Sequence, residues 1–350
     1  MKRVGLIVVL AALALGCRNE DALRHYGAGY LANERGDMAA ALKEFEEAVK
    51  LDDSLTVAHA SIGDILRQQG QLEKAIGPYQ SAIALMPFEF SYRYRLGRVF
   101  QALDRDKDAA KTYETAVDLN PGFAPAWINL GVVYFRLGEL VMARSRCEKA
   151  VELAPDHGYA WSNLGAVYDA MGESHRAVAA YLKSLEIDPK QAPVHINLGT
   201  AYLRQGRVDR ALEELKAAAA LDPNTPIVRK RLAYAYSKQR RYGAAIEQFQ
   251  TALAMDPKDC EARNSLAAIF MILYLRYPDQ DRLRLQALEE WHQSLENNAD
   301  QPAIKAQIAR WAKPLPPEVA AAAAAMSAEE KPHEPPPDSG AAKAEVGSTP

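Results

Sequence analysis

The sequence predicts an all-α protein, built as a solenoid of repeated helical hairpins. The chain has 350 residues, and a 34-residue period runs without insertion or deletion from Ala22 to Asp259, which makes seven blocks. Small residues recur at fixed positions of the blocks, which we number as columns 1 to 34, and glycine and proline recur at others. A constant period of this length is typical of stacked supersecondary units rather than of one globular core.

Each block is predicted to hold two amphipathic helices that pack closely together. Column 8 is glycine in six blocks and Ala233 in the seventh, column 20 is always alanine, and column 27 is alanine or Ser184. Large side chains occupy columns 7 and 24, so columns 4–7–8–11 and 20–24–27 each follow one helix face. The small residues let the two backbones approach while the larger neighbours fill the flanks.

Glycine and proline predict where these helices end. Column 15 is glycine in five blocks, with Asp104 and Arg240 as exceptions, which indicates a left-handed residue after the first helix. Column 32 is proline in six blocks and Asp53 in the first, which ends the second helix. Gly77–Pro78 breaks the pattern inside a second helix, where we expect a tolerated kink or, alternatively, a bend that reshapes the neighbouring surface.

These columns carry a family resemblance. The segments WINLGVVY (Trp127–Tyr134) and WSNLGAVY (Trp161–Tyr168), with the later alanine, aromatic and proline positions, resemble the tetratricopeptide repeat. The resemblance implies a right-handed superhelix of helix–turn–helix units, with seven repeats over residues 22–259.

A divergent eighth repeat and a capping helix are expected over residues 260–312. About eight extra residues stand around Tyr277–Arg284, before Ala287, Trp291 and Ser294 restore the spacing of columns 20, 24 and 27. Asp300 and Pro302 resemble an N-cap and a first helical residue, so we expect a final helix that covers the open end of the stack.

The first residues resemble a bacterial lipoprotein signal. Lys2 and Arg3 precede an apolar run, Val4–Leu15, which is too short to serve as a stable membrane-spanning anchor. The run leads through Gly16 to Cys17 and resembles a lipobox, which implies cleavage of a signal peptide at residues 1–16 and acylation, including palmitoylation, of Cys17. Simple secretion with cleavage nearby is the alternative.

The two ends of the chain are therefore expected to differ. Residues 17–21 would form a short lipid-anchored tether, and Arg18 after the cysteine resembles the sorting signal for the outer membrane, at its periplasmic face, rather than the inner membrane. Proline, alanine and charged residues dominate residues 313–350, where we expect a disordered tail because this composition cannot bury a core.

No motif for catalysis, a cofactor or a metal ion is found, and we predict that the protein is not an enzyme. His25, His59 and His195 stand in column 4, where the family has tryptophan, and are interpreted as packing substitutes. Cys147 is expected in the core, and its distance of three repeats from Cys260 excludes a disulfide bond between them.

The family resemblance places the functional surface on the first helices, through columns 2, 5, 6, 9, 12 and 13. These columns hold eight cationic and four acidic side chains, although the net charge of the chain is −3. Asn129, Asn163 and Asn197 fill column 6 of three successive repeats, and side-chain amides can bond both the N–H and the C=O of an extended peptide. This column resembles the asparagine ladder in the repeat arm of O-linked N-acetylglucosamine transferase; alternatively, asparagine merely suits this helix face. The other predicted peptide-binding residues are Arg95, Arg98, Arg136, Arg204, Lys230, Arg231, Tyr94, Tyr159 and Tyr234.

The sequence thus predicts a membrane-anchored scaffold that binds an extended polypeptide of a partner protein. The chain resembles envelope lipoproteins with tetratricopeptide repeats, such as type IV pilus secretin pilotins, which implies a role in assembling pilus, secretin or peptidoglycan machinery. The alternative is a module that binds a polyanion or glycan through the basic groove, with an affinity that falls steeply with salt. No nucleic acid partner is expected for an exported protein.

Overall fold

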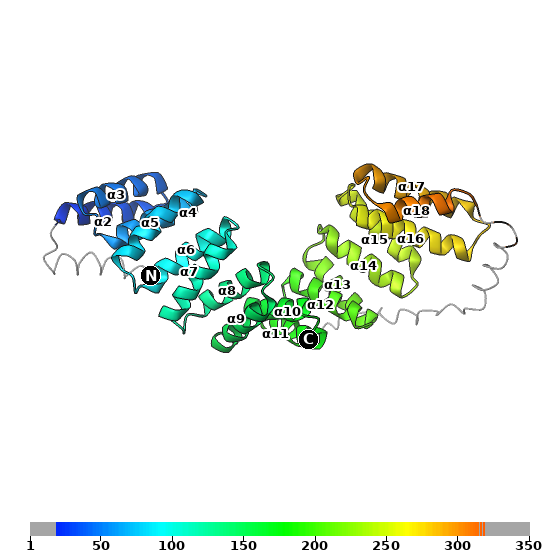
Figure 1. Cartoon of the computed structure of the whole chain (residues 1–350), viewed down its shortest axis with the longest axis horizontal. Coiled ribbons are helices and arrows are strands. Elements are labelled where there is room, and N and C mark those ends of the chain that lie inside the picture. Colours follow the sequence, from blue (N-terminus) through cyan, green and yellow to red (C-terminus); the bar gives the residue numbers. More distant parts are fainter. Residues whose placement is uncertain (1–18, 315, 317, 319–350) are drawn as a thin grey trace, which may run out of the picture. The chain divides into compact units, whose positions relative to one another are not determined.

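The computed structural model describes residues 19–314, 316 and 318, and over these residues the chain forms seventeen α-helices and no strand (Figure 1). The predicted signal peptide, Cys17 and residues 319–350 of the predicted tail lie outside the described residues. The helices belong to two compact units, which divide between Glu214 and Leu215, and each unit is described by itself below.

The helices alternate as the 34-residue period predicts. The first helices of the repeats are α2 (Glu20–Glu34), α4 (Thr56–Gln68), α6 (Phe90–Ala102), α8 (Ala124–Arg136), α10 (Gly158–Ala170), α12 (Ala192–Arg204), α14 (Pro226–Lys238) and α16 (Cys260–Arg276). The second helices are α3 (Met38–Leu51), α5 (Leu72–Leu85), α7 (Asp106–Leu119), α9 (Leu140–Leu153), α11 (Ser174–Ile187), α13 (Val208–Leu221), α15 (Tyr242–Met255) and α17 (Asp281–Asn297), and α18 (Pro302–Trp311) follows them.

Close packing inside each repeat depends on the glycine of column 8. A Cβ atom added at Gly63 or Gly97 would lie within 3.0 Å of the ring of Tyr79 or Tyr113, the residues of column 24 in the same repeats. Both tyrosine side chains are fully buried. The predicted close approach of the two helices is therefore confirmed, and it leaves no room for a larger residue at these positions.

Each unit has its own hydrophobic core. In the first unit, one cluster of buried residues runs from Tyr26 to Val133, and further clusters follow around Cys147 and around Leu198. In the second unit, a single cluster joins α15, α16 and α17 to Trp311 of α18. Cys147 is buried in its cluster, as predicted, and burial raises the pKa of its thiol to about 12. Cys147 and Cys260 are both free thiols.

The turns follow the predicted column chemistry. The column-15 glycines, such as Gly70, have positive φ angles, and the two exceptions adopt the same left-handed conformation, with φ of +55° at Asp104 and +60° at Arg240. The hairpin geometry thus imposes this conformation even where glycine is replaced. Helix α5 runs continuously from Leu72 to Leu85 with Pro78 inside it and has the same length as the other second helices of the seven repeats.

The structure corrects two expected boundaries near the ends of the repeat array. Helix α2 begins at Glu20, because the side chain of Asn19 accepts a hydrogen bond from the N–H of Ala22 and caps the helix. Residues 20 and 21 of the predicted tether are therefore helical. Helix α18 does begin at Pro302, but its N-cap is Gln301 and not Asp300.

The insertion in the eighth repeat lengthens helices rather than one loop. Compared with α14 and α15, α16 is four residues longer and α17 is three residues longer. Only one extra residue falls in the connecting turn, Tyr277–Gln280. Ala287, Trp291 and Ser294 are buried, as their column spacing predicts.

Candidate peptide-binding groove

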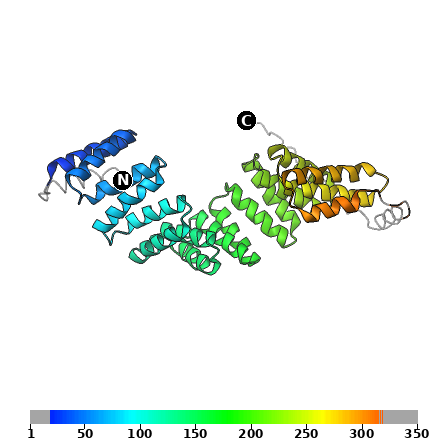
Figure 2. The ribbon, with the colours of Figure 1, turned by 45° about the horizontal axis from the view of Figure 1, so that its top comes forward.

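Within the first unit, successive first helices contact one another: α4 contacts α6, α6 contacts α8, α8 contacts α10 and α10 contacts α12. The hairpins of this unit follow one another in chain order (Figure 2). The first helices therefore form a continuous face, which we call the groove face, and the residues of column 6 lie along it.

Two of the three predicted asparagines share one cavity on the groove face. A cavity of about 450 Å³ between α10 and α12 is lined by Asn163 and Asn197, together with Tyr159 and Gln191. The ring of Tyr159 is 64% exposed, and Asn197 is exposed as well. These amides and this ring are accessible to a ligand.

Asn129 is placed differently from the other two asparagines. Its side-chain N–H donates to the hydroxyl of Tyr113 at 3.2 Å, across the boundary between the third and fourth repeats. The residue of the fourth repeat that corresponds to Tyr113 is Cys147, which has no hydroxyl to offer Asn163. One amide of the predicted ladder is thus partly engaged in holding two repeats together.

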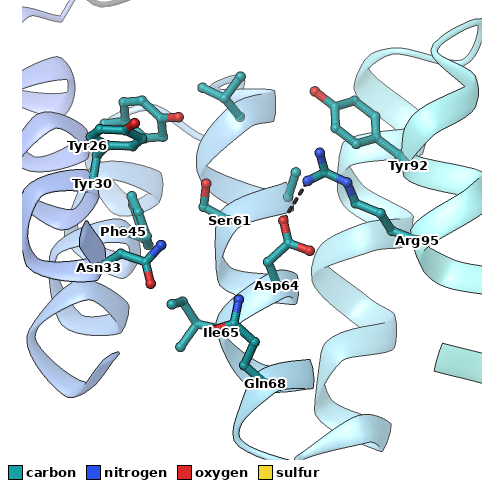
Figure 3. A pocket seen from close by; sticks show the side chains of 12 residues that line it. Tyr26, Tyr30, Asn33, Phe45, Ser61, Asp64, Ile65, Gln68, Tyr92 and Arg95 are labelled. Atoms are coloured by element: carbon teal, nitrogen blue, oxygen red, sulfur yellow. Dashed lines mark hydrogen bonds and ion pairs between the residues drawn. The ribbon is translucent and has the colours of Figure 1, made fainter. Parts of the chain in front are cut away.

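A second cavity, of about 290 Å³, lies on the groove face of the first three repeats (Figure 3). Tyr26 and Tyr30 of α2 line one side, Arg95 and Tyr92 of α6 line the other, and Asp64 of α4 lies between them. The Asp64 carboxylate accepts hydrogen bonds from the hydroxyl of Tyr79 at 2.7 Å and from Arg95 at 2.5 Å. The small side chains of Ala60 and Ser61 also line this cavity, and the column periodicity did not predict its depth.

Most predicted groove cations are already paired with carboxylates. Arg95 is bound to Asp64, Arg204 to Asp169 and Arg136 to Asp104. Lys230 of the second unit lies 2.8 Å from Asp259 and 2.7 Å from Glu261. Several of these acids lie outside the columns that were counted, so the predicted positive excess of the groove is largely neutralised.

Two predicted cations remain without an ion pair. Arg98 and Arg231 have no carboxylate within ion-pair distance in the part of the chain that the structure describes. The predicted tyrosines also differ: Tyr94 is half-buried against Phe123, with ring centroids 4.9 Å apart. Tyr234 is 44% exposed, with the ammonium of Lys238 5.1 Å from its ring centre.

The column-4 side chains share a bond that the sequence analysis missed. Each offers an N–H group to the carbonyl oxygen six residues earlier, at column 32 of the preceding repeat. These bonds join Trp127 to Pro121, Trp161 to Pro155, His195 to Pro189, Arg229 to Pro223 and Arg263 to Pro257. The histidines are therefore hydrogen-bonding substitutes for tryptophan as well as packing substitutes, and the shared N–H donor was the signal available in the sequence.

The described residues contain no group of three or more His, Cys, Asp or Glu side chains arranged to hold a metal ion. Among the same residues, no helix combines the length and the apolar character needed to cross a bilayer.

The hairpin geometry and the column chemistry define an α-solenoid of tetratricopeptide repeats. A family model of this repeat matches residues 63–104. A second family model, described as the C-terminal domain of cilia and flagella-associated protein 70, matches residues 89–301, which is more than half of the chain. The chain belongs to this family of repeat domains.

Solved structures show the same fold. The PilF protein of Pseudomonas aeruginosa is 20% identical, with a TM-score of 0.55 over 62% of this chain and 98% of that chain. Cut9 bound to Hcn1, from the hetero-tetramer of the APC/C, is 17% identical, with a TM-score of 0.57 over 79% of this chain and 53% of that chain. YrrB, described as a repeat protein with an unusual peptide-binding site, is 23% identical, with a TM-score of 0.47 over 53% of this chain and 95% of that chain. No curated protein matches the chain.

Proposed function

We propose that the protein is a membrane-anchored scaffold that binds an extended polypeptide segment of a partner on its groove face. We further propose that it assists the assembly of an envelope complex, such as pilus, secretin or peptidoglycan machinery. The observation that carries the binding role is the cavity in which Asn163, Asn197 and the exposed ring of Tyr159 meet.

The spacing of the repeats suits an extended peptide. Helices in contact lie roughly 8–10 Å apart, and an extended chain rises about 3.3 Å per residue. Asparagines on α10 and α12 are therefore separated by about three residues of a bound strand. Each amide can bond the backbone of that strand, while Tyr159 supplies a large contact surface.

The ion pairs favour a polypeptide ligand over a polyanion. Arg95, Arg136 and Arg204 are held by carboxylates of this chain. A polyanion would have to displace those carboxylates, whereas a peptide backbone requires only hydrogen-bonding partners. The alternative function as a polyanion-binding module therefore loses its main support.

The proposed anchor is supported by the sequence before α2. Cys17 follows the apolar run and stands three residues before Glu20, the first residue of α2. An acyl group on Cys17 would hold the first repeat close to a membrane, and about 0.8 kcal/mol is gained for each buried methylene. This location is the periplasmic face of the outer membrane, by the identity of Arg18.

Replacement of both cavity asparagines tests the binding role. Asn163→Ala with Asn197→Ala should reduce the recovery of partner proteins in a pull-down about tenfold, because two amides that bond the peptide are lost. Thermal unfolding should be unchanged, since neither side chain has a printed hydrogen-bond role in the fold around the cavity. Asn129→Ala is the matched control: it should lower stability through the lost bond to Tyr113 and weaken capture less. Unchanged recovery by the double variant would refute the proposal.

A further inference from the structure

The cavity between α10 and α12 contains a buried acceptor that the chain itself does not satisfy. Gln191, the residue before α12, is only 6% exposed and lines this cavity. Its Nε2 group donates to the carbonyl oxygens of Ser184 and Asp188, at 3.2 and 2.9 Å, and this pair of acceptors fixes the orientation of the amide. The Oε1 atom has no hydrogen-bond donor among the described residues. A buried acceptor in this condition is costly, which indicates that something else supplies the donor.

The eighth repeat holds the same device in a satisfied form. Gln301 precedes α18, and its Nε2 group donates to the carbonyl oxygens of Ser294 and Asn298, at 3.0 and 2.9 Å. Its Oε1 atom accepts a hydrogen bond of 2.8 Å from the Nδ2 group of Asn264. Here the chain provides the donor from column 5 of its own repeat.

The difference between the two copies lies in that one position. Asn264 stands in column 5 of the eighth repeat, and the corresponding residue of the fifth repeat is Ser162. The Ser162 hydroxyl is shorter, and it donates to the carbonyl oxygen of Tyr159 at 3.1 Å. It therefore provides no bond to Gln191, whose acceptor is left to the cavity that Asn163 and Asn197 also line.

We infer that Gln191 Oε1 is a third peptide-binding position, which accepts a backbone N–H of the bound segment. This inference rests on the proposed function and sharpens it, because the Gln191 amide N–H groups are already engaged and only its acceptor is open. Asn163 and Asn197 can bond either a donor or an acceptor of the ligand, but Gln191 requires a donor. The ligand residue opposite Gln191 therefore cannot be proline, which has no N–H.

Ser162→Asn tests the inference by giving the fifth repeat the donor that the eighth repeat has. In the full chain, this variant should raise the Tm by about 2–4 °C, because the buried acceptor gains a bond. The probe is acetyl-tetraalanine amide, followed by NMR through the side-chain amide resonances of Gln191, Asn163 and Asn197. The unmodified protein should show saturable shifts of these resonances, and the affinity of the variant for the probe should be about tenfold lower.

Two controls separate the possible results. Asn264→Ser, the reverse change in the second unit, should lower the Tm and leave binding of the probe at Gln191 unchanged. A probe with a methylated central amide nitrogen should bind the unmodified protein about tenfold more weakly, and this measurement needs no variant that must fold. Equal affinity of Ser162→Asn and the unmodified protein for the probe would overturn the inference, with or without a rise in Tm, since a water molecule would then supply the donor.

The same design separates this inference from the proposed function. If Asn163→Ala with Asn197→Ala abolishes partner capture while Ser162→Asn does not, the groove binds a peptide but Gln191 takes no part. If neither variant affects capture, both proposals fail.

Discussion

At the residue scale, the glycine of column 8 sets the distance between the two helices of a repeat. A Cβ atom at Gly165 would lie 2.7 Å from ring atoms of Tyr181, whereas one at Gly27 would meet nothing within 4 Å. Gly165→Ala should therefore lower the free energy of unfolding by about 1–3 kcal/mol through overpacking. Gly27→Ala should raise it by about 0.5–1 kcal/mol, because alanine is favoured over glycine inside a helix. Urea unfolding measures both variants, and a Gly165→Ala protein as stable as the parent would contradict this account of the packing.

The sequence reveals such packing residues more readily than hydrogen-bonding ones. Gly165 and Tyr181 were identified because size recurs at a fixed period, and periodic size alone specifies a close helix contact. Asn129 and Asn163 have identical column positions, yet only Asn129 has a tyrosine hydroxyl within reach, because the third repeat has Tyr113 where the fourth has Cys147. The open acceptor of Gln191 depends on side-chain orientations, which no single column records.

At the element scale, the helices tolerate local exceptions because their neighbours hold them in place. Helix α5 keeps its full length around Pro78, although a proline inside a helix removes one backbone hydrogen bond and crowds the preceding turn. Helix length in this fold is set by the repeat, and the buried side chains of Ala75, Tyr79 and Ala82 keep α5 in register.

Pro78→Ala should stabilise the first unit. The change restores an N–H donor inside α5 and removes the steric clash, which together cost about 3 kcal/mol in a regular helix. We expect a gain of about 1–3 kcal/mol in the free energy of unfolding, measured by denaturant titration. A loss of stability would mean that α5 is shaped around the proline, and that the bend contributes to packing.

The eighth repeat shows where sequence reasoning about elements fails. Extra residues around Tyr277–Arg284 suggested a longer connection, since insertions commonly fall in loops. The structure instead extends α16 to Arg276 and starts α17 at Asp281. The guanidinium of Arg284 is buried and donates to the carbonyl oxygen of Trp311 at 2.9 Å, so the added turn of α17 contacts the end of α18. A contact between distant segments of this kind leaves no local signal in the inserted residues.

At the scale of the whole molecule, the proposed anchor determines where the scaffold acts. Cys17→Ala should abolish incorporation of palmitate and move the protein from the membrane fraction to the soluble fraction, because no acyl chain can then be attached. Metabolic labelling followed by membrane fractionation measures both effects. Retention of the variant in the membrane fraction would show that another part of the molecule holds it there.

The groove face of the first unit is the central claim for the whole molecule, and site-specific photo-crosslinking in cells tests it most directly. A photoreactive phenylalanine at Ala166, which lines the cavity with Asn163 and Asn197, should capture one discrete set of partner proteins. The same group at Ala179, which lines a separate hollow with Trp161 and Lys183, is the matched control and should capture none of them. Peptide mapping of the Ala166 products should give one short segment of each partner. Equal capture from both positions, or crosslinks scattered over the surface of a folded partner, would contradict binding of an extended segment in the groove.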